Sequence, residues 1–322
     1  MIEARKFLES KIVFYFLGAV FMSAFLFFWN LRPVSSGSVL KIFQISRGEG
    51  FSDIVGRLDT EKLIRSKAVF KIYSIATGSA GQIKPGIYEL SGGSSTPEII
   101  GLLTESSGEI EVRVSDGASV QDIDILLSGK KVLPAGFLVS FAEKNGIEGK
   151  LYPDTYKFSE HSFAEAVAAK FTENFRAKAE PLLNKDPINY RKNLILASLL
   201  QKEISGENDS KIVAGIMKKR LASGMKLDID ATICYLKKIL KGQPNCYPLA
   251  PEDFKIESQY NTYLYTDLPP GPIGSPNASA ISATINSLAS PYWYYLSDPK
   301  TGKTIFAKTL DEQSANRRIY LR

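Results

Sequence analysis

The hydrophobic pattern divides the chain into one continuous apolar run and a longer part in which apolar and polar positions alternate. The run extends from Ile12 to Trp29 and contains no charged residue. A helix needs about 17–25 apolar residues to cross a bilayer, so this run is long enough to span one. A cleaved signal peptide is the alternative, but the run is long for one and no clear small-x-small cleavage site follows Phe25. The pattern favours a retained transmembrane helix over residues 12–29.

The charges around the apolar run predict its orientation. Arg5, Lys6 and Lys11 precede it, and Trp29 closes it at the expected membrane interface. Since positive residues stay on the cytoplasmic side, residues 1–11 are expected in the cytoplasm and everything after the helix outside it. Residues 30–38 contain proline, glycine and serine, a composition typical of a short linker. The chain is therefore expected in the cell inner (plasma) membrane, with its folded part periplasmic or extracellular.

Residues 39–110 follow a pattern typical of a small α+β domain. Alternating apolar residues predict strands at 39–45 and 86–90, and helical spacing predicts helices at 51–58, 67–76 and 96–104. Thr96 is the expected N-cap of the last helix, with Pro97 at its first position. No residues in this segment have the spacing of a catalytic site, so a binding or spacing role is expected.

Residues 111–322 predict a larger mixed α+β domain that begins with a small connecting subdomain. A strand is expected at 111–114 and helices at 119–127, 163–178, 188–203 and 210–222, with Asp209 or Ser210 capping the last. A segment rich in tyrosine, proline and glycine covers 260–276. Paired strands at 291–296 and 304–307 precede a final helix from about Leu310. The predicted fold class is α+β throughout.

Composition narrows the function further. The net charge is +6, but the basic residues are scattered among acids and form no block, which disfavours nucleic acid as a partner. The single histidine, His161, has no histidine or cysteine companion at ligand spacing, so no metal site is expected. His161 is expected to be a surface residue. Cys234 and Cys246 both lie in the exported part, where a disulfide is permitted.

The helix expected at 188–203 places a carboxyl group within an apolar stripe. Leu196, Leu199, Leu200 and Glu203 are spaced to project from one face of a helix. A carboxyl partly removed from water keeps its proton nearer neutral pH, as a general acid must. The alternative, which the pattern alone favours, is a helix that frays near residue 205 and leaves Glu203 in solvent or beside a lysine.

Other polar residues offer further candidates. Asp209 is explained as a helix cap and Glu207 as a solvated loop residue, whereas Asp228 and Asp230 alternate along an expected extended segment. A hydrolase with two carboxylates would need one of these two opposite Glu203. The tyrosine-rich residues 260–263 and the prolines of 268–273 suit a sugar-binding groove or, equally, a turn-rich structural loop.

Five motifs in order resemble the endolytic murein transglycosylase family (YceG-like). They are residues 148–156 (EGKLYPDTY), 197–203 (ASLLQKE), 220–227 (RLASGMKL), 260–263 (YNTY) and 268–273 (LPPGPI). The resemblance implies a single-pass enzyme with a lysin-motif-like domain at 39–110 and a catalytic domain at 111–322. Its expected reaction cleaves the bond between N-acetylmuramic acid and N-acetylglucosamine in peptidoglycan, leaves anhydro-muramic ends and limits the length of nascent strands.

The resemblance also assigns roles to residues. Glu203 is the implied catalytic residue, with no cofactor and no metal, and cell-wall synthases are candidate partners. The implied substrate-binding residues are Asp154, Asp230, Thr232, Tyr260, Asn261, Thr262, Tyr263 and Pro270. The chain departs from the family pattern at Gln201, at Ala231, at Thr304 and at Gln313 with Ser314, the last two sites replacing histidine-containing positions. These changes leave open a catalytically weak or inactive peptidoglycan-binding scaffold.

Overall fold

The computed structural model describes residues 2–37, 39–105, 108–204, 206–242 and 245–321. The chain forms two compact units, Met1–Gly108 and Glu109–Arg322. The first unit begins with the long helix α1 (Ile2–Asn30), whose segment Lys11–Asn30 is long and apolar enough to cross a membrane. Along Lys11–Asn30 most apolar side chains are exposed, and Phe14 is 74% exposed. Such a helix is stable where its surroundings are themselves apolar.

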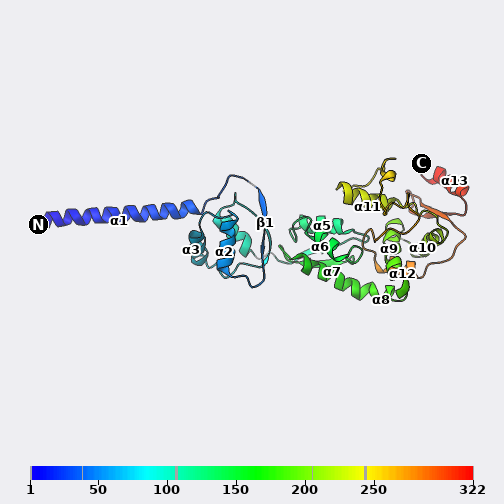
Figure 1. The fold of residues 1–322 in the computed structure, drawn as a ribbon, viewed down its shortest axis with the longest axis horizontal. Coiled ribbons are helices and arrows are strands. Elements are labelled where there is room, and N and C mark those ends of the chain that lie inside the picture. The colour runs from blue at the N-terminus through cyan, green and yellow to red at the C-terminus, as the bar shows by residue number, and fades with distance from the viewer. Residues whose placement is uncertain (1, 38, 106–107, 205, 243–244, 322) are drawn as a thin grey trace. The chain divides into compact units, whose positions relative to one another are not determined.

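The rest of the first unit has the predicted order of strand, helix, helix, strand, helix (Figure 1). These elements are β1 (Leu40–Ile45), α2 (Phe51–Thr60), α3 (Lys67–Ala76), β2 (Gly86–Ser91) and α4 (Thr96–Thr104). The two strands pair antiparallel, with Phe43 opposite Tyr88. Phe43, Phe70 and Leu103 are fully buried in a core that the strands and helices share. Burial of these side chains fixes the helices on the small sheet.

The start of α4 differs from the prediction. Its N-cap is Ser95 rather than Thr96, because the Ser95 hydroxyl accepts a bond from the Glu98 N–H while the Glu98 carboxylate accepts one from the Ser95 N–H at 2.7 Å. This reciprocal capping box satisfies two helix-end donors, which Thr96 alone would not do.

The second unit begins with an antiparallel pair, β3 (Ile110–Arg113) and β4 (Thr155–Phe158). Helices α5 (Val120–Gly129) and α6 (Phe137–Asn145) lie between these strands in sequence, and α7 (Ala164–Lys178) and α8 (Glu180–Leu183) follow. The predictions of β3, α5 and α7 are confirmed within a few residues, whereas α6 and β4 were not predicted.

Three helices form the centre of the second unit (Figure 1). They are α9 (Tyr190–Glu203), α10 (Glu207–Ala222) and α12 (Ala278–Ile285). The core between them contains fully buried Leu199, Leu200 and Val213. At Gly215 of α10 the chain of Leu288 comes so close that an added Cβ would lie 2.0 Å from its carbonyl oxygen. Only glycine permits this approach.

The remaining elements are α11 (Asp230–Lys241), the antiparallel hairpin of β5 (Tyr294–Ser297) and β6 (Thr304–Ala307), and α13 (Leu310–Tyr320). The hairpin and α13 confirm the prediction. The expected extended conformation at Asp230 is wrong, because this residue begins α11. A disulfide joins Cys234 of α11 to Cys246.

The start of α10 also corrects the prediction. Its N-cap is Gly206, so neither Asp209 nor Ser210 caps it, and Glu207 lies in its first turn rather than in a loop. Glu207 pairs with Lys211 one turn later at 2.8 Å. Acidic residues in the first turn of a helix interact favourably with the helix dipole. This interaction explains why α10 begins before the predicted caps Asp209 and Ser210.

Candidate active site

The apolar stripe of α9 ends at Glu203. Leu196, Leu199 and Leu200 are buried as the spacing predicts, and Glu203 is the last helical residue, partly buried. The next residue, Ile204, is extended and buried, so the chain leaves the helix with an apolar anchor just beyond the carboxyl. The helix end is therefore held in place, and Glu203 does not project from a frayed terminus.

The Glu203 side chain lines an open cleft of about 810 Å³. Its walls come from the end of α9, the segment 227–230 that leads into α11, the β5–β6 hairpin and α13. Tyrosines are prominent in these walls, and both acidic and basic side chains line the cleft. The lining residues with polar side chains include Lys202, Glu203, Arg220, Asp228, Asp230, Tyr247, Tyr263, Tyr294, Tyr295, Gln313 and Arg317.

The surroundings of Glu203 favour its protonated form. The pKa of its carboxyl is raised to about 7, chiefly by burial; a hydrogen bond from Tyr295 lowers this pKa in part, and the negative charge of Asp230 adds to the rise. The Tyr295 hydroxyl donates that bond to Glu203 Oε2 at 3.2 Å. The carboxyl thus keeps its proton up to about pH 7 and has one fixed donor that orients it.

Asp230 is another carboxyl of the cleft, and its surroundings differ from those of Glu203. It lies in the first turn of α11, where the helix dipole favours negative charge. The Tyr263 hydroxyl donates to Asp230 Oδ1 at 2.5 Å. One cleft therefore contains a carboxyl disposed to hold a proton and, near it, a second carboxyl that accepts a hydrogen bond from a tyrosine.

Three of the predicted substrate-binding residues are buried and form the frame behind this cleft. Thr232, Asn261 and Thr262 are at most 1% exposed. The Thr262 hydroxyl oxygen accepts from the Ile229 N–H at 2.9 Å and lies 3.1 Å from the Thr232 hydroxyl. The Asn261 amide donates to the carbonyls of Phe254 and Ile256. These bonds fix the loop that carries Tyr263 against the start of α11.

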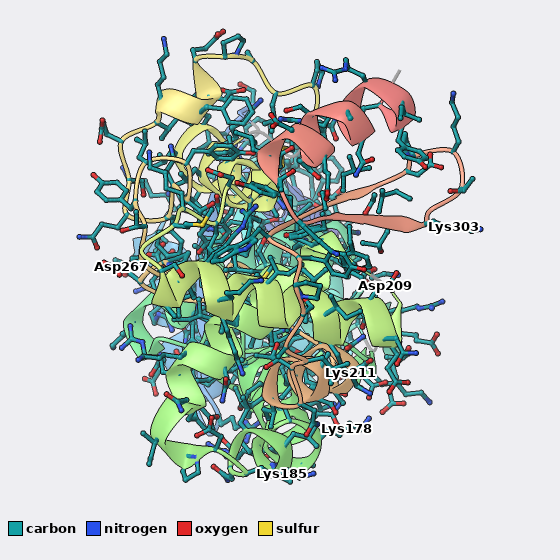
Figure 2. The ribbon with its side chains drawn as sticks, turned by 90° about the vertical axis from the view of Figure 1, so that its right-hand side faces the viewer. Lys178, Lys185, Asp209, Lys211, Asp267 and Lys303 are labelled. Atoms are coloured by element: carbon teal, nitrogen blue, oxygen red, sulfur yellow. A yellow bond between two sulfur atoms is a disulfide. The ribbon has the colours of Figure 1, made fainter. Side chains whose placement is uncertain are left out.

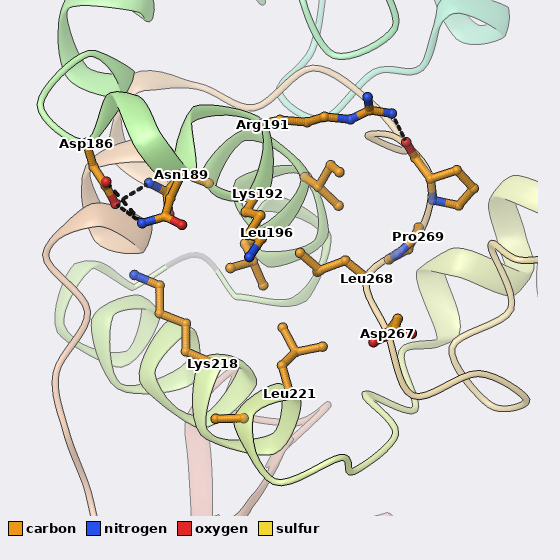
Figure 3. A pocket seen from close by; sticks show the side chains of 14 residues that line it. Asp186, Asn189, Arg191, Lys192, Leu196, Lys218, Leu221, Asp267, Leu268 and Pro269 are labelled. Carbon is orange, nitrogen blue, oxygen red and sulfur yellow. Dashed lines mark hydrogen bonds between the residues drawn. The ribbon is translucent and has the colours of Figure 1, made fainter.

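Two further predicted residues lie elsewhere. Tyr260 packs against Tyr235, with ring centroids 5.1 Å apart. Pro270 lines a separate cavity of about 700 Å³ between the start of α9 and the end of α10 (Figure 3). There its carbonyl accepts from the Arg191 guanidinium at 2.6 Å.

Asp154 is not among the residues that line the Glu203 cleft. Its carboxylate accepts from Lys178 at 2.5 Å and from Asn174 at 2.8 Å, contacts that lower its pKa to about 2. Figure 2 shows Lys178 well separated from Lys303, which lies in the hairpin that borders the cleft. Of the eight predicted binding residues, Asp230 and Tyr263 are therefore the ones that the structure brings to Glu203.

Three side chains outside the set of predicted site residues also shape the cleft. Tyr295 binds Glu203 directly, and the Gln313 amide donates to the Tyr295 carbonyl at 3.0 Å. The buried Arg220 guanidinium donates to the carbonyls of Trp293 at 2.8 Å and Leu227 at 2.9 Å. Arg220 thus joins the segment at Leu227 to the residue that precedes β5, and both segments border the cleft. In the part of the chain that the structure describes, no group of three or more metal-ligating side chains is arranged to hold an ion.

The titration of Glu203 is a direct test of this geometry. We expect its carboxyl to titrate near pH 7 in ¹³C NMR spectra of glutamate-labelled protein, with the signal assigned by its loss in Glu203→Gln. The Tyr295→Phe variant should titrate at higher pH, because the lost hydrogen bond stabilises the charged form. Glu207 is the internal control, since its pairing with Lys211 lowers its pKa below 4.5. A Glu203 midpoint near that of Glu207 would contradict the site.

A partly buried proton donor beside a carboxylate, in an open cleft with tyrosine walls, defines a candidate acid–base site for a polar polymer such as a carbohydrate. The YceG-like family model matches residues 43–319, and the chain belongs to this family.

The relatives with known names match different shares of the chain. The chain is 27% identical over 323 residues to an endolytic murein transglycosylase of Bacillus subtilis, with 90% of this chain and 88% of that protein covered. It is 29% identical to an endolytic murein transglycosylase of Streptococcus pneumoniae over 53% of this chain and 31% of that protein. A crystal structure of a yceG-like protein from Listeria monocytogenes matches 87% of this chain and 99% of its own, with 26% identity and a TM-score of 0.54.

Proposed function

We propose that this protein is an endolytic lytic transglycosylase that cleaves the bond between N-acetylmuramic acid and N-acetylglucosamine within peptidoglycan strands. The observation that carries the proposal is Glu203, a proton-bearing carboxyl at about pH 7 that lines an open cleft. The names of the relatives support the same chemistry over most of the chain. They favour an enzyme over the alternative of an inactive scaffold.

One carboxyl suffices for the proposed reaction. Glu203 donates its proton to the glycosidic oxygen as the bond to the muramic acid breaks, and its carboxylate then accepts a proton from the primary hydroxyl of the same sugar. That hydroxyl oxygen bonds to the anomeric carbon, so the product is an anhydro-muramic end and no water is consumed. An attacking group within the same molecule needs no second nucleophile from the protein.

Asp230 supports this step through its charge. The bond from Tyr263 holds it as an acceptor, so it adds negative charge to the cleft in which the sugar becomes positive. Gln313 replaces a residue that is commonly histidine in the family, yet it lines the cleft and holds the strand that carries Tyr295. The departure at this position therefore leaves the contact to Glu203 in place.

The first unit supplies the proposed location. Helix α1 would anchor the chain in the cell membrane with residues 1–11 in the cytoplasm, and the second unit would act on strands outside it. The strand, helix, helix, strand order supports a lysin-motif-like role for residues 39–110 in holding glycan. Cleavage close to the membrane would limit the length of strands as they are made. Cell-wall synthases are the proposed protein partners.

Product analysis in ¹⁸O-labelled water tests the proposal. Full-length protein in detergent should shorten purified glycan strands by internal cuts, giving ends that borohydride does not reduce and that contain no ¹⁸O. A hydrolase that uses Asp228 or Asp230 as second carboxylate would give reducible ends with one ¹⁸O each. Reducible, labelled ends would refute the transglycosylase, and strand binding without cleavage would favour the scaffold.

A further inference from the structure

A smaller cavity of about 240 Å³ adjoins the Glu203 cleft. Lys202 and Tyr247 line both spaces, so these two side chains form the boundary between them. The rest of the smaller cavity is made by α11 residues, the disulfide and Ile273. A substituent on a sugar bound in the cleft could therefore enter this cavity, which lies beside Glu203.

Lys202 brings a positive charge to this boundary. Its aliphatic stem lies against Gly117, where an added Cβ would be 3.2 Å from Lys202 Cε. Among the described residues its ammonium group makes no hydrogen bond and no ion pair. Partial burial lowers the pKa of this ammonium, an effect that an anionic partner in the cavity would reverse.

The nearby acidic groups are already engaged. Asp122 accepts from Lys238 at 2.5 Å and from the Ser119 hydroxyl at 2.8 Å. Glu148 accepts from the backbone N–H of Val120 at 3.2 Å, and burial raises its pKa to about 7. The second cation of the cavity, Lys238, is therefore neutralised by Asp122, whereas Lys202 is available to a ligand.

The wall of the smaller cavity that Tyr247 forms is fixed by covalent and hydrogen bonds. Tyr247 is 67% exposed, but it follows Cys246, whose sulfur is bonded to Cys234 of α11. The Cys246 carbonyl also accepts from the buried Lys237 ammonium at 2.9 Å. An exposed aromatic ring on a fixed segment offers a face against which a sugar or its substituent can pack.

We propose that this cavity, defined by Lys202, Tyr247 and the Cys234–Cys246 disulfide, receives the carboxylate-bearing substituent of the muramic acid, with Lys202 as its cationic partner. This inference rests on the proposed function. Muramic acid differs from glucosamine by a lactyl ether that ends in a carboxyl group. That carboxyl is free on a bare strand, or it is linked to a peptide that carries carboxylates of its own. Both sources present the same chemistry to Lys202.

The test compares three substrates. The first substrate is glycan strands that carry their peptides. The second is bare strands, from which an amidase has removed the peptides. The third is bare strands whose lactyl carboxyls have been converted to methylamides. The Lys202→Met variant keeps the aliphatic stem and removes the charge. Lys185→Met, at an exposed lysine distant from the hairpin (Figure 2), is the matched control. Full-length proteins in detergent are assayed for kcat/KM on each substrate.

We expect Lys202→Met to lower kcat/KM about tenfold on a substrate whose carboxylate is recognised, and to leave the methylamide substrate unchanged. A loss on the peptide-bearing strands alone identifies a peptide carboxylate, and a loss on the bare strands alone identifies the lactyl carboxylate. Lys185→Met should match wild type on all three.

Equal losses on all three substrates, or no loss on any, would overturn the inference and leave the proposed function standing. Failure of the wild-type protein to cleave any strand would instead refute the proposed function itself. The two failures are therefore distinguishable in one experiment.

Discussion

The Glu203→Gln variant is expected to cut glycan strands about 10³-fold more slowly than the wild-type protein. Glutamine keeps the shape of the side chain and can still accept the bond from Tyr295, but it has no acidic proton to give. General acid–base catalysis contributes about 10²–10⁴-fold, and here one group serves in both steps. The measurement is the initial rate at which non-reducible ends form at saturating strand concentration.

Glu207→Gln provides the matched control for this variant. Glu207 lies on the next helix, but it is exposed and paired with Lys211, so its loss should change the rate by less than about twofold. A Glu203→Gln variant that keeps wild-type turnover would remove Glu203 from the mechanism. If Glu203→Gln kept wild-type turnover while Asp230→Asn abolished cleavage in the same assay, the acid would have to be assigned to α11.

Local periodicity explains why the central residue of the site could be predicted. The stripe of Leu196, Leu199 and Leu200 depends only on the pitch of one helix, and the structure buries all three as expected. The partner of Glu203 could not be found in this way. Tyr295 is 92 residues further along the chain, and its contact depends on the packing of the hairpin against α9.

The polar loop motifs show a different limit of sequence reasoning. Asn261 and Thr262 were predicted to contact substrate, but both are buried and bond to backbone groups. The next residue in the same motif, Tyr263, lines the cleft. Polar residues in a loop can satisfy the backbone or face a ligand, and only the fold decides which.

Helix α11 was missed because its first turns do not favour a helix locally. Residues 229–235 include isoleucine, threonine, cysteine and tyrosine, which have modest helix propensity. Burial of Ile233 and Leu236 on one face outweighs this preference. The consequence for the site is direct, because the helix places Asp230 at its N-terminus rather than in an extended segment.

The Arg220→Met variant is expected to lose about 3 kcal/mol of the free energy of unfolding of the second unit. The buried guanidinium donates to the carbonyls of Trp293 and Leu227, and methionine fills similar space without donating to either. Each buried acceptor left without a partner costs about 1–3 kcal/mol. The midpoint in urea can be followed by Trp293 fluorescence in a Trp29→Phe background, since the chain has only these two tryptophans.

Arg318→Met is the control, because Arg318 is an exposed residue of α13 and its replacement should change stability by less than about 0.5 kcal/mol.

The Arg220→Met variant should also cleave strands more slowly at urea concentrations at which it is folded. Arg220 ties the segment that precedes Asp230 to the strand that carries Tyr295, so its loss loosens both walls around Glu203. Equal urea midpoints for Arg220→Met and Arg318→Met would show that the cleft is held together by other contacts.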